Sequence, residues 1–253
     1  MNEDILKKRG ETAMDTGAIE WHSQIASEFD AKYANRPNFM ERHKIWTDII
    51  SKYSEQKKEV CDLGCGSGIF SLYAAARNKC VISVDGSAEM IALCERKKKE
   101  NGIANVKFVC SDIKEFLSDK SKKNSYDIII CSSVIEYFEE SDNIFAAMGD
   151  ALKDDGILLC SIPNADSVYR KLEKKLYDCF RFPEYYKLVK YATNAATLSG
   201  KIDKMGFYSL ECHYYASTPL LSRMFRAIGI EKYSDNLFLI AARKAGKPFP
   251  GTS

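Results

Sequence analysis

Short apolar runs alternate with amphipathic segments along most of the chain, and this alternation predicts an α/β fold. Each run is short enough to be a strand and ends in a turn rich in Gly, Pro, Asn, Asp or Ser. The amphipathic segments between the runs repeat their apolar residues at helical spacing. The expected strands are the run that ends at Asp62 and residues 80–84, 106–110, 126–131, 156–162, 207–215 and 236–242.

Further helices are expected before and between these strands. Residues 18–33 and 39–53 carry Ile, Phe, Tyr and Trp at helical spacing and predict N-terminal cap helices. A turn at residues 153–156 is expected to precede the fifth strand. Residues 164–196 are too long for a plain loop and predict a helical cap, or lid, inserted after that strand. The predicted boundaries are 1–17 for a mobile N-terminal arm, 18–245 for the main domain and 246–253 for a frayed tail.

The stretch from Val60 to Phe70 carries the most specific pattern. Asp62 ends an apolar run, and Gly64, Gly66 and Gly68 follow at alternate positions before an amphipathic segment. A phosphate-binding P-loop would need Lys-Ser/Thr after its last Gly, and the dinucleotide fingerprint needs one more residue between its last two glycines. An acid at the strand end favours a ligand with an ammonium group. The alternative is a tight strand–helix turn that binds nothing.

This stretch resembles motif I of the class I S-adenosylmethionine (SAM)-dependent methyltransferases, whose usual form is D/E-x-G-x-G-x-G. Asp85 after the second strand, Asp112 after the third and an apolar fourth strand continue the resemblance in order. It implies a Rossmann-like, seven-stranded, mostly parallel sheet with an antiparallel last strand. It also implies SAM as the cofactor and S-adenosylhomocysteine (SAH) as its product.

The resemblance assigns cofactor roles residue by residue. Asp62 and the backbone of residues 64–68 would hold the methionine end, Asp85 the ribose, Met90 the adenine face and Asp112 the adenine amine. Asp112 could equally serve only as the N-cap of the next helix. The predicted cofactor-binding residues are Asp62, Gly64, Cys65, Gly66, Gly68, Asp85, Gly86, Ser87, Met90, Ser111, Asp112, Ile113, Cys131 and Ser132.

Within this class, the chain looks most like small-molecule O-methyltransferases of the ubiquinone pathway and their Mg-protoporphyrin relatives. In the latter an N-terminal Tyr overlies the active site, and Tyr33 matches it. Both families usually carry a His at the position of Tyr137. The ubiquinone enzymes also carry a Glu of a proposed metal site at the position of Ser133. Because Ser133 replaces that Glu here, no metal ligand is predicted. The candidate catalytic residues are Glu136, Tyr137 and Tyr33.

Two alternatives accompany these catalytic candidates. Glu136 could instead be an acid placed at a helix N-terminus by the helix dipole. The chain has three histidines, His22, His43 and His213. A lone His is more often structural than catalytic, so none of the three is included among the candidate catalytic residues.

Composition narrows the function classes. The net charge of +2 predicts neither nucleic acid nor an anionic membrane as partner, and no apolar run is long enough to span a bilayer. Nine Cys without a C-x-x-C pair predict reduced, mostly buried thiols in a cytoplasmic protein; Cys61, Cys80, Cys110, Cys131 and Cys160 lie in apolar runs.

The expected function is methylation of an oxygen, or as the second choice a nitrogen, of a small metabolite such as a sugar, phenol or quinone precursor. Two alternatives stay open: a methyltransferase that acts on a glycan or a protein, and a non-catalytic SAM-binding module. The aromatic residues of the cap fit a ring-shaped acceptor, because rings stack on aromatic faces. They fit the interface of a homodimer equally well.

Overall fold

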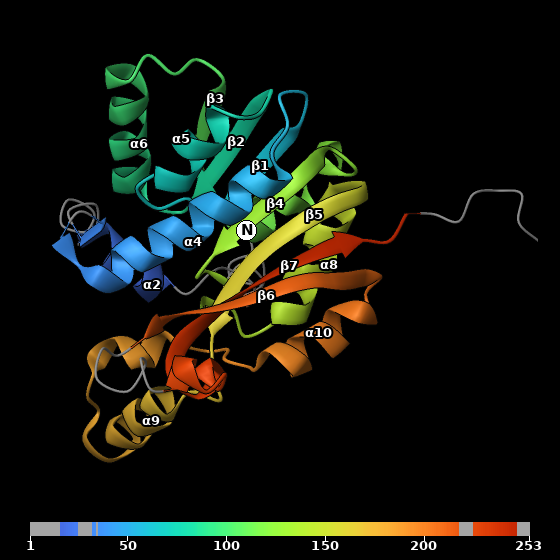
Figure 1. Cartoon of the computed structure of the whole chain (residues 1–253). Coiled ribbons are helices and arrows are strands. Elements are labelled where there is room, and N and C mark those ends of the chain that lie inside the picture. The colour runs from blue at the N-terminus through green and yellow to red at the C-terminus, as the bar shows by residue number, and fades with distance from the viewer. Residues whose placement is uncertain (1–15, 25–31, 34, 218–224, 247–253) are drawn as a thin grey trace, which may run out of the picture.

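A seven-stranded sheet forms the centre of the computed structural model, which describes residues 16–24, 32–33, 35–217 and 225–246 (Figure 1). The strand order is β3-β2-β1-β4-β5-β7-β6. Strands β1 to β5 pair in parallel, and β7 runs antiparallel to both β5 and β6. The strands are β1 (Glu59–Leu63), β2 (Cys80–Asp85), β3 (Val106–Cys110), β4 (Tyr126–Ser132), β5 (Leu152–Pro163), β6 (Phe207–Ser217) and β7 (Asp235–Lys244). The predicted sheet, with its antiparallel last strand, is confirmed.

Helices cover both faces of the sheet. The α-helices are α2 (Thr16–Gln24), α4 (Pro37–Tyr53), α5 (Ile69–Ala75), α6 (Ala88–Glu100), α7 (Ile113–Ser118), α8 (Ser141–Ala151), α9 (Val168–Phe180) and α10 (Ala195–Asp203). Short 3₁₀ turns are η1 (Lys120–Lys122), η2 (Ile135–Tyr137), η3 (Glu184–Leu188) and η4 (Glu231–Tyr233). One core cluster joins α4, α5 and α6 to the sheet, and the other joins α7, α8 and α10 to its opposite face.

Strand β4 shows why the apolar runs form the middle of the sheet. Its side chains alternate between the two faces. Ile128 and Ile130 belong to one core cluster, whereas Ile129 and Cys131 belong to the other. All four side chains are buried, as expected for a parallel strand covered by helices on both sides.

The structure corrects two predicted boundaries. Residues 153–156 are not a separate turn but part of an irregular start of β5, because pairing with β4 moves from Tyr126–Leu152 to Ile128–Ile157. The extra residues of β5 are therefore accommodated within the strand, and Asp155 takes a positive φ of 63° there. Helix α4 begins at Pro37, two residues earlier than expected, because Pro fits the first turn of a helix.

Several predictions fall wholly or partly on residues outside the described ranges. Thr16 and Gly17 belong to α2 rather than to the expected arm, and residues 1–15 lie outside the described residues. So do residues 25–31 of the predicted first helix and residues 247–253 of the predicted tail. No described helix has the length and apolar character needed to cross a bilayer.

The cysteines depart from expectation in two places. All nine are free thiols. Cys61, Cys131 and Cys160 are buried as expected, but Cys80 is only partly buried and Cys110 is exposed. Cys110 ends β3, which is an edge strand of the sheet.

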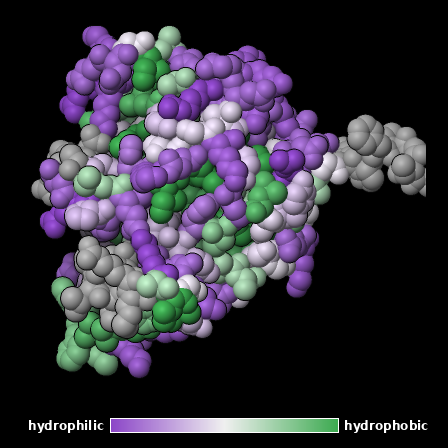
Figure 2. All heavy atoms as spheres, in the orientation of Figure 1, coloured by the Kyte–Doolittle hydropathy of each residue, from purple (hydrophilic) through white to green (hydrophobic). Residues whose placement is uncertain are grey.

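The segment predicted as a cap follows β5 and contains α9 and η3. Helix α9 lies beyond the end of the sheet (Figure 1). It exposes apolar side chains, and hydrophobic residues gather in this region at the lower left of Figure 2. The exposed apolar residues of α9 are Val168, Tyr169, Leu172, Leu176 and Phe180.

Candidate active site

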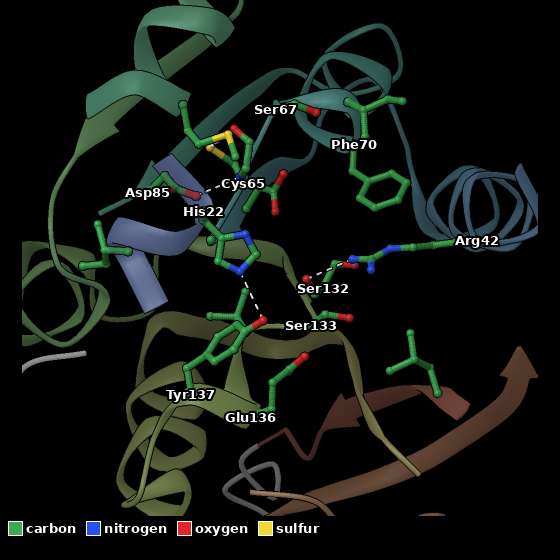
Figure 3. Close-up of a pocket in the computed structure, with 18 of the residues that line it drawn as sticks. His22, Arg42, Cys65, Ser67, Phe70, Asp85, Ser132, Ser133, Glu136 and Tyr137 are labelled. Carbon is green, nitrogen blue, oxygen red and sulfur yellow. Dashed lines mark hydrogen bonds between the residues drawn. The ribbon is translucent and has the colours of Figure 1, made fainter. Parts of the chain in front are cut away.

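A cavity of about 220 Å³ lies where β1, β2 and β4 end (Figure 3). In open α/β sheets this edge is the usual place for a ligand. Helices α2 and α4 supply further walls. Of the residues predicted from the sequence, those that line the cavity are Asp62, Gly64, Cys65, Gly66, Asp85, Met90, Ser132, Tyr33, Glu136 and Tyr137.

The glycine-rich turn forms one wall with its backbone. Gly64, Gly66 and Gly68 have φ values of 70°, 52° and 74°, a region that L-residues with a side chain rarely adopt. A Cβ at Gly64 would lie 2.3 Å from Cγ2 of Val134, so only glycine fits there. The turn can therefore bring its backbone against a ligand without a side chain in the way.

Two carboxyl groups flank this turn, and burial raises the pKa of both. Asp62 accepts a hydrogen bond from Ser71 Oγ at 2.6 Å. Its pKa rises to about 7, chiefly by burial, although the Ser71 bond opposes the shift. Asp85 accepts hydrogen bonds from the backbone N–H groups of Gly66 at 2.8 Å and Ser87 at 2.9 Å. These bonds oppose the rise in the pKa of Asp85 that burial causes. A cationic or hydroxyl-bearing ligand would find acceptors at both positions.

Glu136 lies on η2, just after β4, and is buried. Its Oε2 accepts no hydrogen bond from any described residue. Burial raises the pKa of Glu136 to about 7, against the opposing influence of its own backbone N–H and of Arg42 and Arg170. A carboxyl group with this pKa at the wall of a cavity is suited to take up or release a proton near neutral pH.

His22 reaches the same cavity from α2. Its Nε2 lies 3.1 Å from the hydroxyl of Tyr137 (Figure 3). Burial lowers the pKa of His22 to about 4, and the nearby cations Arg42 and Lys32 lower it further. His22 is therefore neutral at pH 7 and can accept or donate one hydrogen bond at Tyr137. His22 is not among the catalytic candidates that the sequence indicated, because a lone His is more often structural than catalytic.

Arg42 is another polar residue that sequence reasoning missed. It reaches from α4, and its Nη2 donates to Oγ of Ser132 at 2.7 Å and to the Ser132 carbonyl at 3.2 Å. Its Nε is buried and has no hydrogen-bond partner among the described residues. The cavity thus holds a cation beside its carboxyl groups. Ser67, within the indicated 64–68 backbone, also lines the cavity. The other lining residues that the sequence did not indicate are Ile19, Trp21, Ile69, Phe70, Ser133, Val134, Arg170 and Leu237.

The predicted residues outside the lining have other contacts. Asp112 Oδ1 accepts from the backbone N–H groups of Lys114 and Glu115, so Asp112 caps α7. Ser87 Oγ caps α6 by accepting from Met90 N–H. The predicted cofactor-binding residues that do not line the cavity are Gly68, Gly86, Ser87, Ser111, Asp112, Ile113 and Cys131. Their cofactor roles stay predictions.

The two remaining histidines do not line this cavity. The His43 ring stacks with Phe70, with ring centres 6.5 Å apart, and His213 Nε2 lies 2.9 Å from Glu211. Within the part of the chain that the structure describes, no group of three or more His, Cys, Asp or Glu side chains is arranged to hold a metal ion.

Comparison with known proteins gives matches in sequence. A family model described as a methyltransferase domain matches residues 54–208. The ubiquinone biosynthesis O-methyltransferase of Rickettsia felis is 32% identical over 117 residues, 46% of this chain and 46% of that protein. The malonyl-(acyl-carrier protein) O-methyltransferase of Halalkalibacterium halodurans is 25% identical over 174 residues, 66% of this chain and 61% of that protein. The chain spans about half the length of the ubiquinone relatives it matches.

Solved structures show the same fold. The magnesium protoporphyrin IX methyltransferase of Synechocystis, solved with bound SAH, has a TM-score of 0.68 at 15% identity and covers 91% of this chain and 99% of its own. The N-methyltransferase NodS of Bradyrhizobium japonicum, also with SAH, has a TM-score of 0.58 at 16% identity and covers 84% of this chain and 90% of its own.

Proposed function

We propose, on the premise that this chain belongs to the family of methyltransferase domains, that it moves the methyl group of SAM to an oxygen atom of a small metabolite. One observation carries the proposal. A single cavity is lined by the glycine-rich turn, by Asp62 and Asp85, and by Glu136 and Tyr137. The groups that suit a cofactor and those that suit an acceptor therefore face the same space.

The residues at the turn fit the chemistry of SAM. Asp62 would take its ammonium group, and Arg42, with an unpaired buried Nε, its carboxylate. Asp85, at the end of β2, would accept the ribose hydroxyls. Met90 would pack against the adenine. When bound, SAM supplies a methyl group already activated on a positively charged sulfur.

Glu136 would act as the general base for an acceptor hydroxyl. In its ionised form, Oε2 can take the hydroxyl proton while the acceptor oxygen forms its bond to the methyl carbon in line with the leaving sulfur. Tyr137, held by His22, would position the acceptor oxygen. The buried walls would exclude water and fix the reacting geometry, which supplies much of the rate enhancement in such a displacement.

The acceptor class follows from weaker observations. Tyr33 lines the cavity, and its ring meets the rings of Phe39 and Phe70 edge-on, so a flat acceptor would find aromatic walls. The curated relatives named above are O-methyltransferases by name. The nine free thiols favour a reducing compartment such as the cytoplasm. We also propose that two copies of the chain form a homodimer in which the exposed apolar residues of α9 lie at the interface.

The test is methyl transfer from labelled SAM to a panel of phenols, quinone precursors, sugars and small acids. We expect turnover by the wild type, and a kcat at least about 100-fold lower for Glu136→Gln, because general-base catalysis typically contributes 10²–10⁴-fold. Glu140→Gln, an exposed acid on the same loop whose partner Lys114 lines neither cavity, is the matched control and should retain activity. Equal kcat values for Glu136→Gln and the wild type would exclude Glu136 as the base. SAH binding without turnover on any small acceptor would favour the glycan, protein or non-catalytic alternative.

A further inference from the structure

A second cavity lies between α9 and residues 186–192, at the carboxyl end of β5. Its volume is about 310 Å³, which is within the range of small-molecule sites. Pro163 and Asn164 at the end of β5 form its floor, and Lys171 and Lys174 of α9 form one wall. Asn164 also bridges to Thr193, so the two sides are joined by backbone pairing.

The lining of this second cavity is strongly basic. Arg170, Lys171, Lys174 and Lys190 all contribute to it, and no Asp or Glu is among the described residues that line it. Cations converging on one concave surface attract an anion, because each can donate a charge-assisted hydrogen bond.

The acids that pair with these cations stand outside the lining. The pairs are Arg170 with Glu173 at 3.0 Å, Lys174 with Asp178 at 3.5 Å and Lys190 with Glu139 at 3.9 Å. The Lys174–Asp178 pair is largely solvent-exposed, and pairs of that kind contribute little. Arg170 is closely paired with the buried Glu173, so the positive charge that an anionic ligand could use comes chiefly from Lys171, Lys174 and Lys190.

The other wall of the second cavity is partly aromatic. Tyr186, Val189 and Tyr191 line it, so an anionic group attached to an apolar or ring-shaped body would meet matching surfaces. A free inorganic ion would use only the basic part of this lining.

Two connections join this cavity to the candidate active site. Arg170 lines both cavities. The backbone N–H groups of Lys190 and Tyr191 donate to the carbonyl of Glu136 at 2.7 and 3.1 Å. A ligand in the second cavity would thus lie beside the loop that carries the candidate base.

We propose that the cavity between α9 and residues 186–192 binds a carboxylate or phosphate group of the methyl acceptor. The acceptor is then an acidic molecule whose hydroxyl enters the first cavity while its anionic group lies past Arg170, among Lys171, Lys174 and Lys190. This inference rests on the proposed function, because it assigns the anion to the molecule that is methylated.

The test is a titration of the full ¹⁵N-labelled chain, saturated with SAH, with inorganic phosphate and separately with succinate. We expect saturable amide shifts at residues 170–174 and 190–192. The anion that binds more tightly identifies the phosphate or the carboxylate as the natural group. Lys171→Gln with Lys174→Gln should weaken binding about tenfold or more, which corresponds to about 1.4 kcal/mol.

The matched control is Lys175→Gln with Lys204→Gln, which removes two exposed positive charges that do not line the cavity. Its affinity for both anions should stay within about twofold of the wild type at constant ionic strength. Shifts that occur elsewhere, or an equal loss in both double variants, would overturn the inference. Failure of SAH itself to bind would instead contradict the proposed function, so the two failures are distinguishable.

Discussion

Glu136 is a buried acid whose burial destabilises the folded protein. It is only 5% exposed, and its Oε2 has no hydrogen-bond partner among the described residues. Burial of a carboxyl group without full hydrogen bonding disfavours its charged form. Such a group is expected where a proton must be exchanged with a ligand rather than where the fold alone needs it.

The raised pKa of Glu136 makes the stability of the protein depend on pH. The pKa moves from 4.5 to about 7 on folding. The contribution of this pKa shift to the free energy of unfolding is therefore fully present below about pH 4.5 and is lost as the pH rises through 7. Glu136→Gln removes this titration. The free energy of unfolding of the variant, minus that of the wild type, should grow between pH 4.5 and 8 by the order of 3 kcal/mol.

Denaturant unfolding at a series of pH values measures this difference directly. Asp62 and His22 titrate in both proteins, so their effects cancel in the comparison. Ser51→Ala, which removes no titratable group, should show a difference that does not change with pH. A constant difference for Glu136→Gln would mean that Glu136 titrates normally in the folded protein.

Where the signal was local, sequence reasoning selected residues that the structure brings to one cavity. Asp62, Gly64 and Gly66 lie within one turn, and the spacing of the glycines sets their position. His22 and Arg42 could not be found in the same way. They reach the cavity from helices, and 115 residues separate His22 from Tyr137. Only the three-dimensional packing of α2 and α4 on the sheet brings them there.

Helix α2 connects the two ends of the cavity. Its Ser23 Oγ lies 2.7 Å from Ser87 Oγ, after β2, and its His22 lies 3.1 Å from the Tyr137 hydroxyl, after β4. Ile19 of the same helix packs so closely on Gly86 that a Cβ there would lie 2.7 Å from its Cδ1. The helix therefore forms one wall of the cavity, and Ser23 and His22 join it to the ends of β2 and β4.

We expect the double variant Ser23→Ala with His22→Ala to loosen α2 without unfolding the sheet. Each hydrogen bond contributes about 1 kcal/mol, so the amides of α2 should exchange with solvent about tenfold faster or more. SAH should bind several-fold more weakly, and the thermal midpoint should change little. Ser51→Ala, on α4, is the control for loss of an exposed serine contact. Unchanged exchange in α2 would show that other contacts hold this helix.

At the scale of elements, the apolar runs were sufficient to predict most strands. The start of β5 was not predictable, because residues 153–156 look like a turn by composition and join the strand only through pairing with a distant strand. The helical character of Thr16 and Gly17 was missed for a related reason, since their local sequence lacks an apolar repeat.

The sheet order explains where the site lies in the whole molecule. From β1, the next two strands, β2 and β3, are added on one side of the sheet, and β4 and β5 are added on the other side. The strand order therefore reverses between β1 and β4. Ligands of open α/β sheets bind at such a point, beyond the carboxyl ends of the strands. This rule and the strand pattern were enough to predict, from the sequence, the edge of the sheet at which the structure has its cavity. The acceptor end was not predictable in detail, because α2, α4 and α9 shape it.

Isothermal titration of the whole protein with SAM and with SAH tests the central claim most directly. We expect the wild type to bind both, and Asp85→Asn to bind at least about tenfold more weakly, a loss of about 1.4 kcal/mol or more. The exposed Asp48→Asn should bind like the wild type. Absence of binding to a folded wild type would contradict the assignment of this cavity to SAM.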